Sequence, residues 1–166
     1  MLLPMDPPTS PRPGPACLDG VGLPETEVPT GIPPREKKVR VLVVEDETLV
    51  ACLIREIVRG RFECEVDVVA NGVAAFERLA HTRYALVVSD VRMPEMNGAE
   101  LYLWLREAQP ATAQSFVFVT AYAEERHFET KLAAWGVPIV AKPFTESQFL
   151  AVCGPYLDRS LDLPAR

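Results

Sequence analysis

The sequence lacks any run of apolar residues long enough to cross a membrane. A membrane helix needs roughly 20 consecutive apolar residues, and no stretch of this 166-residue chain approaches that length. The first residues, Met-Leu-Leu-Pro-Met-Asp, carry neither the basic nor the apolar segment of a secretory signal. These absences exclude a membrane-spanning protein, and we expect no membrane insertion and a cytoplasmic location.

Histidine is scarce, and the cysteines are not paired in sequence. The chain has two histidines and four cysteines without CxxC spacing, which are too few and too isolated for a usual zinc site. We therefore expect reduced thiols and no zinc framework. The four cysteines are Cys17, Cys52, Cys64 and Cys153.

An excess of basic charge is also absent. The formal net charge is −6, and acidic and basic residues are interspersed. Binding to nucleic acid through bulk positive charge is therefore not expected. The acidic residues have to be considered one at a time.

Proline, in contrast, is abundant and unevenly placed. Ten of the 16 prolines lie within residues 1–36. We divide the chain into a proline-rich leader without a stable fold (1–38), a compact body (39–157) and a short tail (158–166). A chain of this length holds one domain and an appendage, so we expect a stand-alone module with no attached output domain.

From residue 39 onward, short β-branched runs alternate with amphipathic stretches. This alternation is typical of βαβ units with right-handed connections. We predict an α/β fold with a doubly wound, five-stranded parallel sheet in the flavodoxin-like order 2-1-3-4-5 and helices on both faces. The predicted strands are residues 39–44, 66–69, 85–88, 116–119 and 139–141, and the predicted helices are residues 48–59, 73–80, a helix after Gly98, about 123–135, and 145–157.

The apolar spacing also predicts the ends and the buried faces of the helices. Gly60 and Gly136 are expected to end the first and the fourth helix. The expected buried positions are Leu49, Leu53, Ile54 and Ile57 in the first helix and Val73, Phe76, Leu79 and Ala80 in the second.

Polar residues follow four of the five predicted strands. In sheets of this type, ligands bind at the carboxyl ends of the strands. Carboxylates crowded there repel one another unless a cation is present, and a set of oxygen ligands suits Mg²⁺ together with phosphate oxygens. The polar residues are Glu45 and Asp46 after the first strand, Asp90 after the third, Thr120 at the end of the fourth and Lys142 at the end of the fifth.

The same residues predict a bound phosphoryl group. Lys142 can pair with a phosphoryl oxygen, and Thr120 can donate a hydroxyl hydrogen bond to it. Asp90 is the best candidate to accept the group as an acyl phosphate, because it follows a buried run of the central strand and leads into a long loop.

Five short motifs occur in order along the body. They are VLVVEDE at 41–47, ANG at 70–72, SDVRMPEMNG at 89–98, VTA at 119–121 and AKPF at 141–144. In this combination the sequence strongly resembles the receiver domain of two-component response regulators, over residues 39 to about 157.

The resemblance implies a role for each residue of the predicted site. Asp90 corresponds to the phosphoacceptor, Thr120 to the hydroxyl that contacts the phosphoryl group, and Lys142 to the lysine that pairs with it. A bound Mg²⁺ or Mn²⁺ ion is implied as well. Its implied ligands are Asp46, Asp90, the main-chain carbonyl of Arg92 and, through water, Glu45.

The resemblance further implies a cis peptide bond before Pro143 and a special backbone conformation at Gly98. One position departs from the family. Ile139 stands where members usually carry Tyr or Phe, so the family's aromatic switch does not carry over. The bulk of Arg92 and Tyr122 near the acceptor leads us to expect slow autodephosphorylation.

The resemblance also implies partners. The phosphoryl donor would be a sensor histidine kinase or a histidine phosphotransfer protein. In the family, the fourth helix, fifth strand and fifth helix usually contact the output, which corresponds here to residues 123–157 and a downstream protein target. No enzyme activity is expected beyond self-phosphorylation and autodephosphorylation.

Three other functions compete with this interpretation. A phosphohydrolase with an aspartate nucleophile needs a second acid two residues after Asp90, where this chain has Arg92. An FMN-binding protein needs a first loop rich in Ser, Thr and Gly, whereas residues 45–47 are all acidic. A receiver-like module that binds partners without phosphorylation is the main alternative, although the complete set of acids, threonine and lysine disfavours it.

Overall fold

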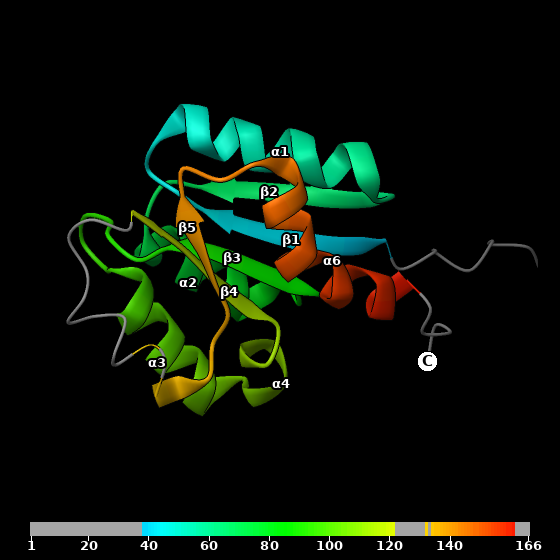
Figure 1. Ribbon diagram of the computed structural model, residues 1–166. Helices are drawn as coiled ribbons and strands as arrows, with labels where there is room; N and C mark the ends of the chain where they lie inside the picture. Colours follow the sequence, from blue (N-terminus) through cyan, green and yellow to red (C-terminus); the bar gives the residue numbers. More distant parts are fainter. Residues whose placement is uncertain (1–37, 122–131, 133, 162–166) are drawn as a thin grey trace, which may run out of the picture. The chain divides into compact units, whose positions relative to one another are not determined.

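The computed structural model of the protein describes residues 38–121, 132 and 134–161 (Figure 1). The predicted leader up to residue 37, the tail from residue 162 and most of the predicted helix at 123–135 lie outside the described residues. In the part of the chain that is described, no helix is long and apolar enough to cross a membrane.

Five parallel strands form one sheet in the order β2-β1-β3-β4-β5, which confirms the predicted fold class. Because all five strands run in one direction, their carboxyl ends share one edge of the sheet and their amino ends share the other. The strands are β1 (Val39–Val44), β2 (Cys64–Val69), β3 (Leu86–Asp90), β4 (Phe116–Ala121) and β5 (Ile139–Lys142).

Helices cover both faces of this sheet (Figure 1). α1 (Thr48–Arg61) and α6 (Glu146–Leu161) pack on one face. α2 (Gly72–His81), α3 (Gly98–Ala108) and the short α4 (Pro110–Ala113) pack on the other. The sequence patterns do not predict α4.

The residues of β1 show how the sequence produces this layering. Alternate residues of a strand point to opposite faces of the sheet. Val41 and Val43 belong to the core on the side of α1 and α6, while Leu42 and Val44 belong to the core on the side of α2 and α3. Because both faces are buried at residues 41–44, this part of the strand is apolar without alternation of apolar and polar residues, and the charged Arg40 lies before it, where β1 is only half-buried.

The buried face of α1 differs in part from the predicted one. Ile54 and Ile57 are buried as predicted, but Leu49 and Leu53 are 86% and 48% exposed. Apolar residues occupy two sides of this helix, and their spacing does not reveal which side faces the sheet. The expectation of a buried Leu49 and Leu53 is therefore wrong.

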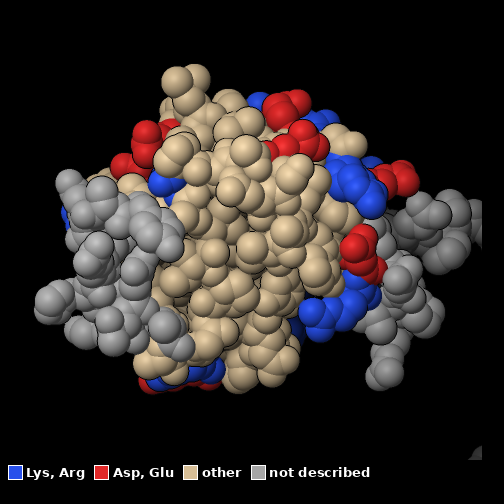
Figure 2. Space-filling view, viewed as in Figure 1, with Lys and Arg blue, Asp and Glu red and all other residues tan. Residues whose placement is uncertain are grey.

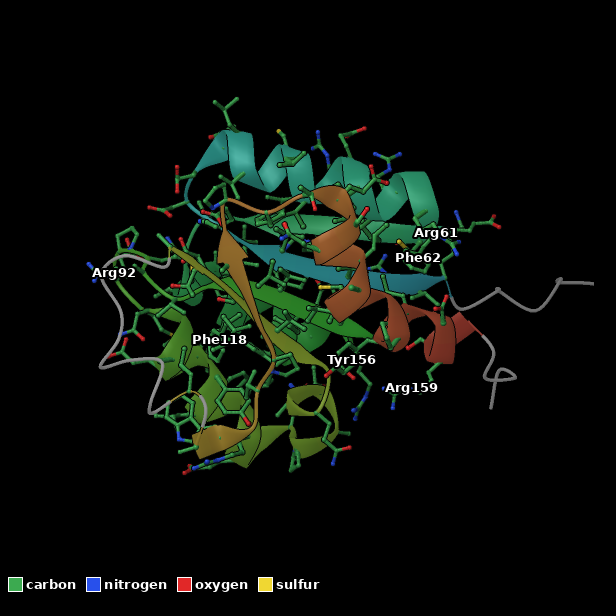
Figure 3. The ribbon with its side chains drawn as sticks, viewed as in Figure 1. Arg61, Phe62, Arg92, Phe118, Tyr156 and Arg159 are labelled. Atoms are coloured by element: carbon green, nitrogen blue, oxygen red, sulfur yellow. The ribbon has the colours of Figure 1, made fainter. Side chains whose placement is uncertain are left out.

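The end of α1 also differs from the prediction. The helix continues through Gly60 to Arg61, so Gly60 does not end it. Phe62 follows in an extended conformation, and its buried ring lies 5.3 Å from the Arg61 guanidinium carbon (Figure 3). The helix therefore ends next to a residue whose ring enters the core.

In α2, the prediction holds for one residue of four. Leu79 is buried, whereas Ala80 is exposed and Val73 and Phe76 are 39% and 38% exposed. The Phe76 ring lies 4.5 Å from the Trp104 ring of α3, centroid to centroid. Phe76 therefore contributes to the contact between α2 and α3.

Two elements extend beyond their predicted ends. β2 begins at Cys64, before the predicted residue 66, and α6 continues to Leu161, past the predicted end at 157. Gly136 has a φ of 68° before β5, which fits its predicted role at a helix end. The three described cysteines, Cys52, Cys64 and Cys153, are free thiols.

Candidate functional site

The carboxyl edge of the sheet brings the predicted polar residues together. Asp90 and Lys142 are the last residues of β3 and β5, and Thr120 lies near the end of β4. Glu45 and Asp46 directly follow β1. The Glu45 N–H donates at 2.9 Å to the carbonyl of the last β2 residue, so the sheet itself fixes the backbone of this acid.

Lys142 links three strands at this edge. Its Nζ donates hydrogen bonds of 3.0 Å to Asp90 Oδ2 and 3.0 Å to Glu45 Oε1. Burial lowers the pKa of Lys142, but the hydrogen bonds to Glu45 and Asp90 outweigh this effect, and the net shift of the pKa is upward. The lysine is therefore held in its charged form between two acids.

Glu45 is buried, with 2% of its surface exposed. Burial raises its pKa to about 7, and the nearby charge of Asp90 adds to this against the lowering effect of Lys142. The Oε2 atom of Glu45 is fully buried and accepts no hydrogen bond, although Lys142 Nζ lies 2.9 Å away. The lysine therefore serves both oxygens of this carboxylate, and a cation-bound water would give Oε2 a hydrogen bond of its own.

The acidic residues fit a divalent cation. Glu45, Asp46 and Asp90 each place one carboxylate oxygen within 4.8 Å of the other two. Asp46 is exposed while the other two are buried, so the cluster opens to solvent on one side. Oxygen ligands with room for several waters are what Mg²⁺ requires.

Asp90 can be reached from solvent, because its side chain is 10% exposed. Oδ1 accepts a hydrogen bond of 3.2 Å from the Arg92 N–H, and Oδ2 faces Lys142. In the β3–β4 register Asp90 lies opposite Val119, the residue before Thr120. The buried Thr120 therefore lies one residue further toward the carboxyl edge than the position opposite the predicted acceptor.

Gly98, the first residue of α3, lies against the backbone of Asp90. A Cβ at this position would lie 2.1 Å from the Asp90 carbonyl oxygen and 2.8 Å from Ser89 Oγ. Its N–H donates to the Val91 carbonyl at 3.0 Å. Among the described glycines, positive φ occurs at Gly136 alone. The expected special conformation of Gly98 is therefore wrong: glycine is required here because the two backbones approach closely.

Glu47 belongs to the site although the sequence reasoning did not assign it. It precedes α1, its N–H donates to Glu45 Oε1 at 3.3 Å, and its Oε1 lies 3.4 Å from Lys142 Nζ. Its side chain is 65% exposed. The available signal was the run of three consecutive acids after β1.

The β5 strand confirms one expectation that came from the resemblance and one departure from it. The peptide bond between Lys142 and Pro143 is cis. Ile139 packs against the core on the side of α2 and α3 and lies opposite Phe118 of β4. An aliphatic side chain thus occupies the position that is usually aromatic. Tyr122 lies outside the described residues.

The sheet order and the acids gathered around one lysine define a flavodoxin-like α/β protein with a candidate cation and phosphoryl site at the carboxyl edge. The family model of the response regulator receiver domain matches residues 41–153. This chain belongs to that family.

Two curated relatives show the same similarity. Transcription factor SKN7 of Candida albicans is 32% identical over 120 residues, which cover 72% of this chain and 21% of that protein. Protein-glutamate methylesterase/protein-glutamine glutaminase 3 of Paramagnetospirillum magneticum is 33% identical over 113 residues, covering 66% and 30%. The chain therefore spans less than a third of the length of these relatives.

Solved structures agree with this assignment. Response regulator protein TrrA of Thermotoga maritima, solved in complex with Mg²⁺-BeF, is 27% identical with a TM-score of 0.63, over 72% of this chain and 99% of that chain. Chemotaxis response regulator CheY4 of Vibrio cholerae has the same TM-score and coverage at 23% identity. The second match supports the fold alone.

Proposed function

We propose that this receiver accepts a phosphoryl group on Asp90 from a phosphohistidine of a sensor histidine kinase or histidine phosphotransfer protein. The observation that carries the proposal is the contact of 3.0 Å between Lys142 Nζ and Asp90 Oδ2, beside an acidic cluster. The lysine supplies positive charge at the atom where a transferred phosphoryl group would need it.

In the proposed transfer, a carboxylate oxygen of Asp90 forms a bond to phosphorus, and the bond between phosphorus and the imidazole nitrogen of the donor breaks. The imidazole leaves with the electron pair of that bond and takes up a proton from solvent. Lys142 shifts a hydrogen bond from the carboxylate to a phosphoryl oxygen, and the Thr120 hydroxyl donates to another. Positioning and charge neutralisation thus account for the rate.

The acidic cluster would hold Mg²⁺, for which Mn²⁺ is the expected substitute. When bound, the cation neutralises charge on the carboxylates and on the phosphoryl oxygens. The proposed ligands are Asp46, Asp90 and the main-chain carbonyl of Arg92, with Glu45 contributing through a water. The buried Glu45 Oε2 that accepts no hydrogen bond supports a water at this point.

The donor must bring its histidine to the opening of the site, so it must contact the surface around it. Beside Glu47 and Lys142, that surface is mainly apolar. Leu49 and Leu53 are exposed on α1, and a cavity of about 390 Å³ between α1 and the start of the β5–α6 loop is lined by Val50, Pro143 and Phe144 among others. We propose that an apolar face of the donor covers these residues.

The proposed output is a change in contact with a downstream protein target through residues 123–157, of which 132 and 134–157 are described. Figure 2 shows the face of the molecule that carries α6 and β5 as a broad surface with few charges, bordered by charged residues. Receiver domains are not enzymes in general. The proposed chemistry is limited to self-phosphorylation and to autodephosphorylation, slowed by Arg92 and by Tyr122, which lies outside the described residues.

The test is labelling with acetyl phosphate, read by intact mass, with and without Mg²⁺. Asp90→Asn removes the acceptor. Asp67→Asn is the matched control, because Asp67 lies in β2 and accepts a hydrogen bond from Tyr84. We expect Mg²⁺-dependent label on the wild type and on Asp67→Asn, and none on Asp90→Asn.

Two outcomes would contradict the proposal. Label that persists in Asp90→Asn, or that forms without a divalent cation, would show that the chemistry is wrong. A wild type that is never labelled by acetyl phosphate or by a phosphorylated kinase, yet binds its target, would identify the phosphorylation-independent binding module.

A further inference from the structure

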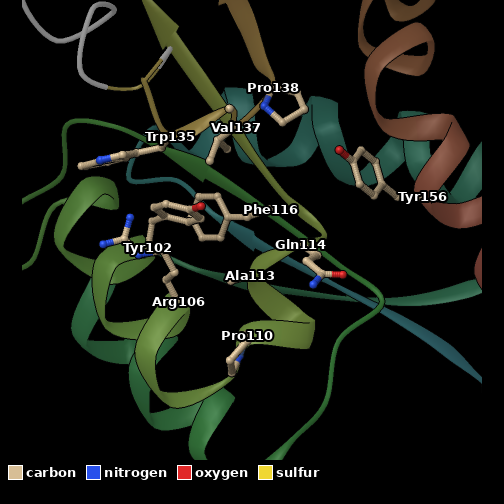
Figure 4. Close-up of a pocket in the computed structure, with 11 residues that line it drawn as sticks. Tyr102, Arg106, Pro110, Ala113, Gln114, Phe116, Trp135, Val137, Pro138 and Tyr156 are labelled. Carbon is tan, nitrogen blue, oxygen red and sulfur yellow. The ribbon is translucent and has the colours of Figure 1, made fainter.

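The amino edge of the sheet carries a cavity that the phosphoryl chemistry does not use. It has a volume of about 360 Å³ and lies where β4 and β5 begin, between α3, α4 and α6 (Figure 4). Asp90 and Lys142 end their strands at the opposite edge. The volume lies within the range of pockets that hold small molecules.

One wall of the cavity is a flat aromatic surface. The rings of Tyr102 and Trp135 are stacked, with centroids 5.4 Å apart and planes inclined by 30°. Tyr102 also makes edge contacts with Phe116 at 5.3 Å and with Phe118 at 5.8 Å. These contacts fix the Tyr102 ring, so a planar ligand would meet a surface that is already oriented.

Polar groups without protein partners also line this cavity. Within the described part of the chain, the side chains of Arg106 and Gln114 and the hydroxyls of Tyr102 and Tyr156 make no hydrogen bond or ion pair. Tyr102 is only 6% exposed, yet its hydroxyl is not among the fully buried unpaired atoms of the described residues, so it can be reached. The cavity therefore offers several hydrogen-bonding groups to a ligand.

The positive charge at this cavity favours a negatively charged ligand. Among the described residues that line it, Arg106 is the one charged residue and none is acidic. Arg106 lies four residues after Tyr102 in α3, so both project from the same side of that helix. Figure 4 shows Arg106 on the same side of the cavity as Tyr102 and Trp135, with Gln114 and Tyr156 on the other side.

We propose that this cavity binds a small planar aromatic acid, with its ring against the wall of Tyr102 and Trp135 and its carboxylate paired with Arg106. One arginine suits a single carboxylate, which it can bind through two parallel hydrogen bonds. The free amide of Gln114 and hydroxyl of Tyr156 supply further polar contacts at the far end. This site is separate from Asp90 and does not depend on its phosphorylation.

The probe for the test is 2-naphthoate, followed by the NMR signal of the Trp135 indole N–H, which Trp104→Phe assigns because the chain has two tryptophans. We expect saturable shifts with 2-naphthoate and at least tenfold weaker binding of the uncharged 2-naphthamide and of the non-aromatic cyclohexanecarboxylate. Arg106→Gln is expected to weaken 2-naphthoate about tenfold, the effect of losing a charge-assisted hydrogen bond.

Matched controls keep the test specific. Arg59→Gln removes an exposed arginine of α1, on the other face of the sheet, and should leave binding unchanged. Asp90→Asn should also bind 2-naphthoate like the wild type, which separates this proposal from the proposed function. Both Arg106 and Arg59 are exposed, so both variants are expected to fold.

Three results would overturn the proposal. The first is the absence of a saturable Trp135 shift with 2-naphthoate. The second is equal affinity of 2-naphthoate for the wild type and for Arg106→Gln. The third is tighter binding of a proline-rich peptide, independent of Arg106, which would make the cavity a peptide groove.

Discussion

The two edges of this sheet are built in opposite ways. At the carboxyl edge, Lys142 Nζ lies 3.0 Å from an oxygen of Asp90 and 2.9 Å from one of Glu45, so two like charges are held together by a single lysine. At the amino edge, Tyr102 and Phe116 pack as rings with centroids 5.3 Å apart. The first arrangement is the one that the proposed phosphoryl chemistry would use, and the second is close packing of apolar rings.

The largest expected effect follows from removing a ring at the amino edge. Phe116 is 1% exposed and contacts two other rings. We expect Phe116→Ala to lower the free energy of unfolding by about 3–5 kcal/mol, measured by urea denaturation. The matched change at the carboxyl edge is Phe144→Ala, which removes a half-buried ring and should cost less than half as much. Equal losses in the two variants would break the comparison.

A smaller effect is expected where the carboxyl edge is tightly packed. In Gly98→Ala the new methyl group would lie 2.1 Å from the Asp90 carbonyl oxygen, so the backbone has to shift. We expect a loss of about 1–3 kcal/mol together with weaker Mg²⁺ binding. Gly60→Ala is the control, since no atom lies within 4 Å of its added Cβ, and should stabilise α1 by up to about 1 kcal/mol.

Removing a charge at the carboxyl edge should raise the free energy of unfolding, whereas the two preceding changes lower it. Asp90 raises the pKa of Glu45 through like-charge repulsion, and Lys142 retains Glu45 as a partner in Asp90→Asn. Without Mg²⁺ we expect Asp90→Asn to gain about 1 kcal/mol in the free energy of unfolding.

Addition of Mg²⁺ sharpens this prediction. The cation stabilises the state that binds it, so the wild type should gain more from Mg²⁺ than Asp90→Asn does. If Asp90→Asn is less stable than the wild type without Mg²⁺, then repulsion between Glu45 and Asp90 does not destabilise the protein.

The smallest expected effect is at a polar contact near the amino edge. The Tyr84 hydroxyl donates to Asp67 Oδ2 at 2.7 Å, and burial, followed by this hydrogen bond, raises the pKa of Tyr84 from 10 to about 12. A raised pKa means that the contribution to stability is complete below pH 10 and is lost as the pH rises through 12.

Tyr84→Phe tests this contribution. We expect the variant to lose about 0.5–1 kcal/mol at neutral pH and to show a weaker fall of unfolding free energy between pH 10 and 12. Parallel curves for the two proteins across that range would contradict the assignment of this pH dependence to Tyr84.

The sequence predicted the place of the site well, for a physical reason. Parallel strands align their carboxyl ends at one edge of the sheet. A polar residue that follows an apolar run in the sequence can therefore be placed at that edge. Asp90, Lys142 and Glu45 are distant in the chain, yet their placement required only the strand order. The roles of these residues as acceptor, partner and metal ligand stay predictions that the labelling experiment tests.

Side-chain direction was harder to predict. Leu49 and Val73 are apolar and correctly spaced, yet both are exposed, because spacing identifies an apolar side of a helix without showing where the sheet lies. Glu47 was missed since its contact with Lys142 depends on how α1 begins. The aromatic cavity was not predicted either, because its lining residues come from four separate segments with no shared motif.

The hydrogen bond between Glu45 and Lys142 joins residues 97 positions apart in the chain. Contacts between such distant residues form late, since the loss of chain entropy precedes the gain from the contact. All the proposed ligands of the cation lie at or just after the ends of β1 and β3, whereas Lys142 is the last residue of β5. In a chain in which β5 has not yet joined the sheet, Asp90 therefore lacks its lysine partner. Labelling of Asp90 would then report, during refolding, the moment at which the last strand docks.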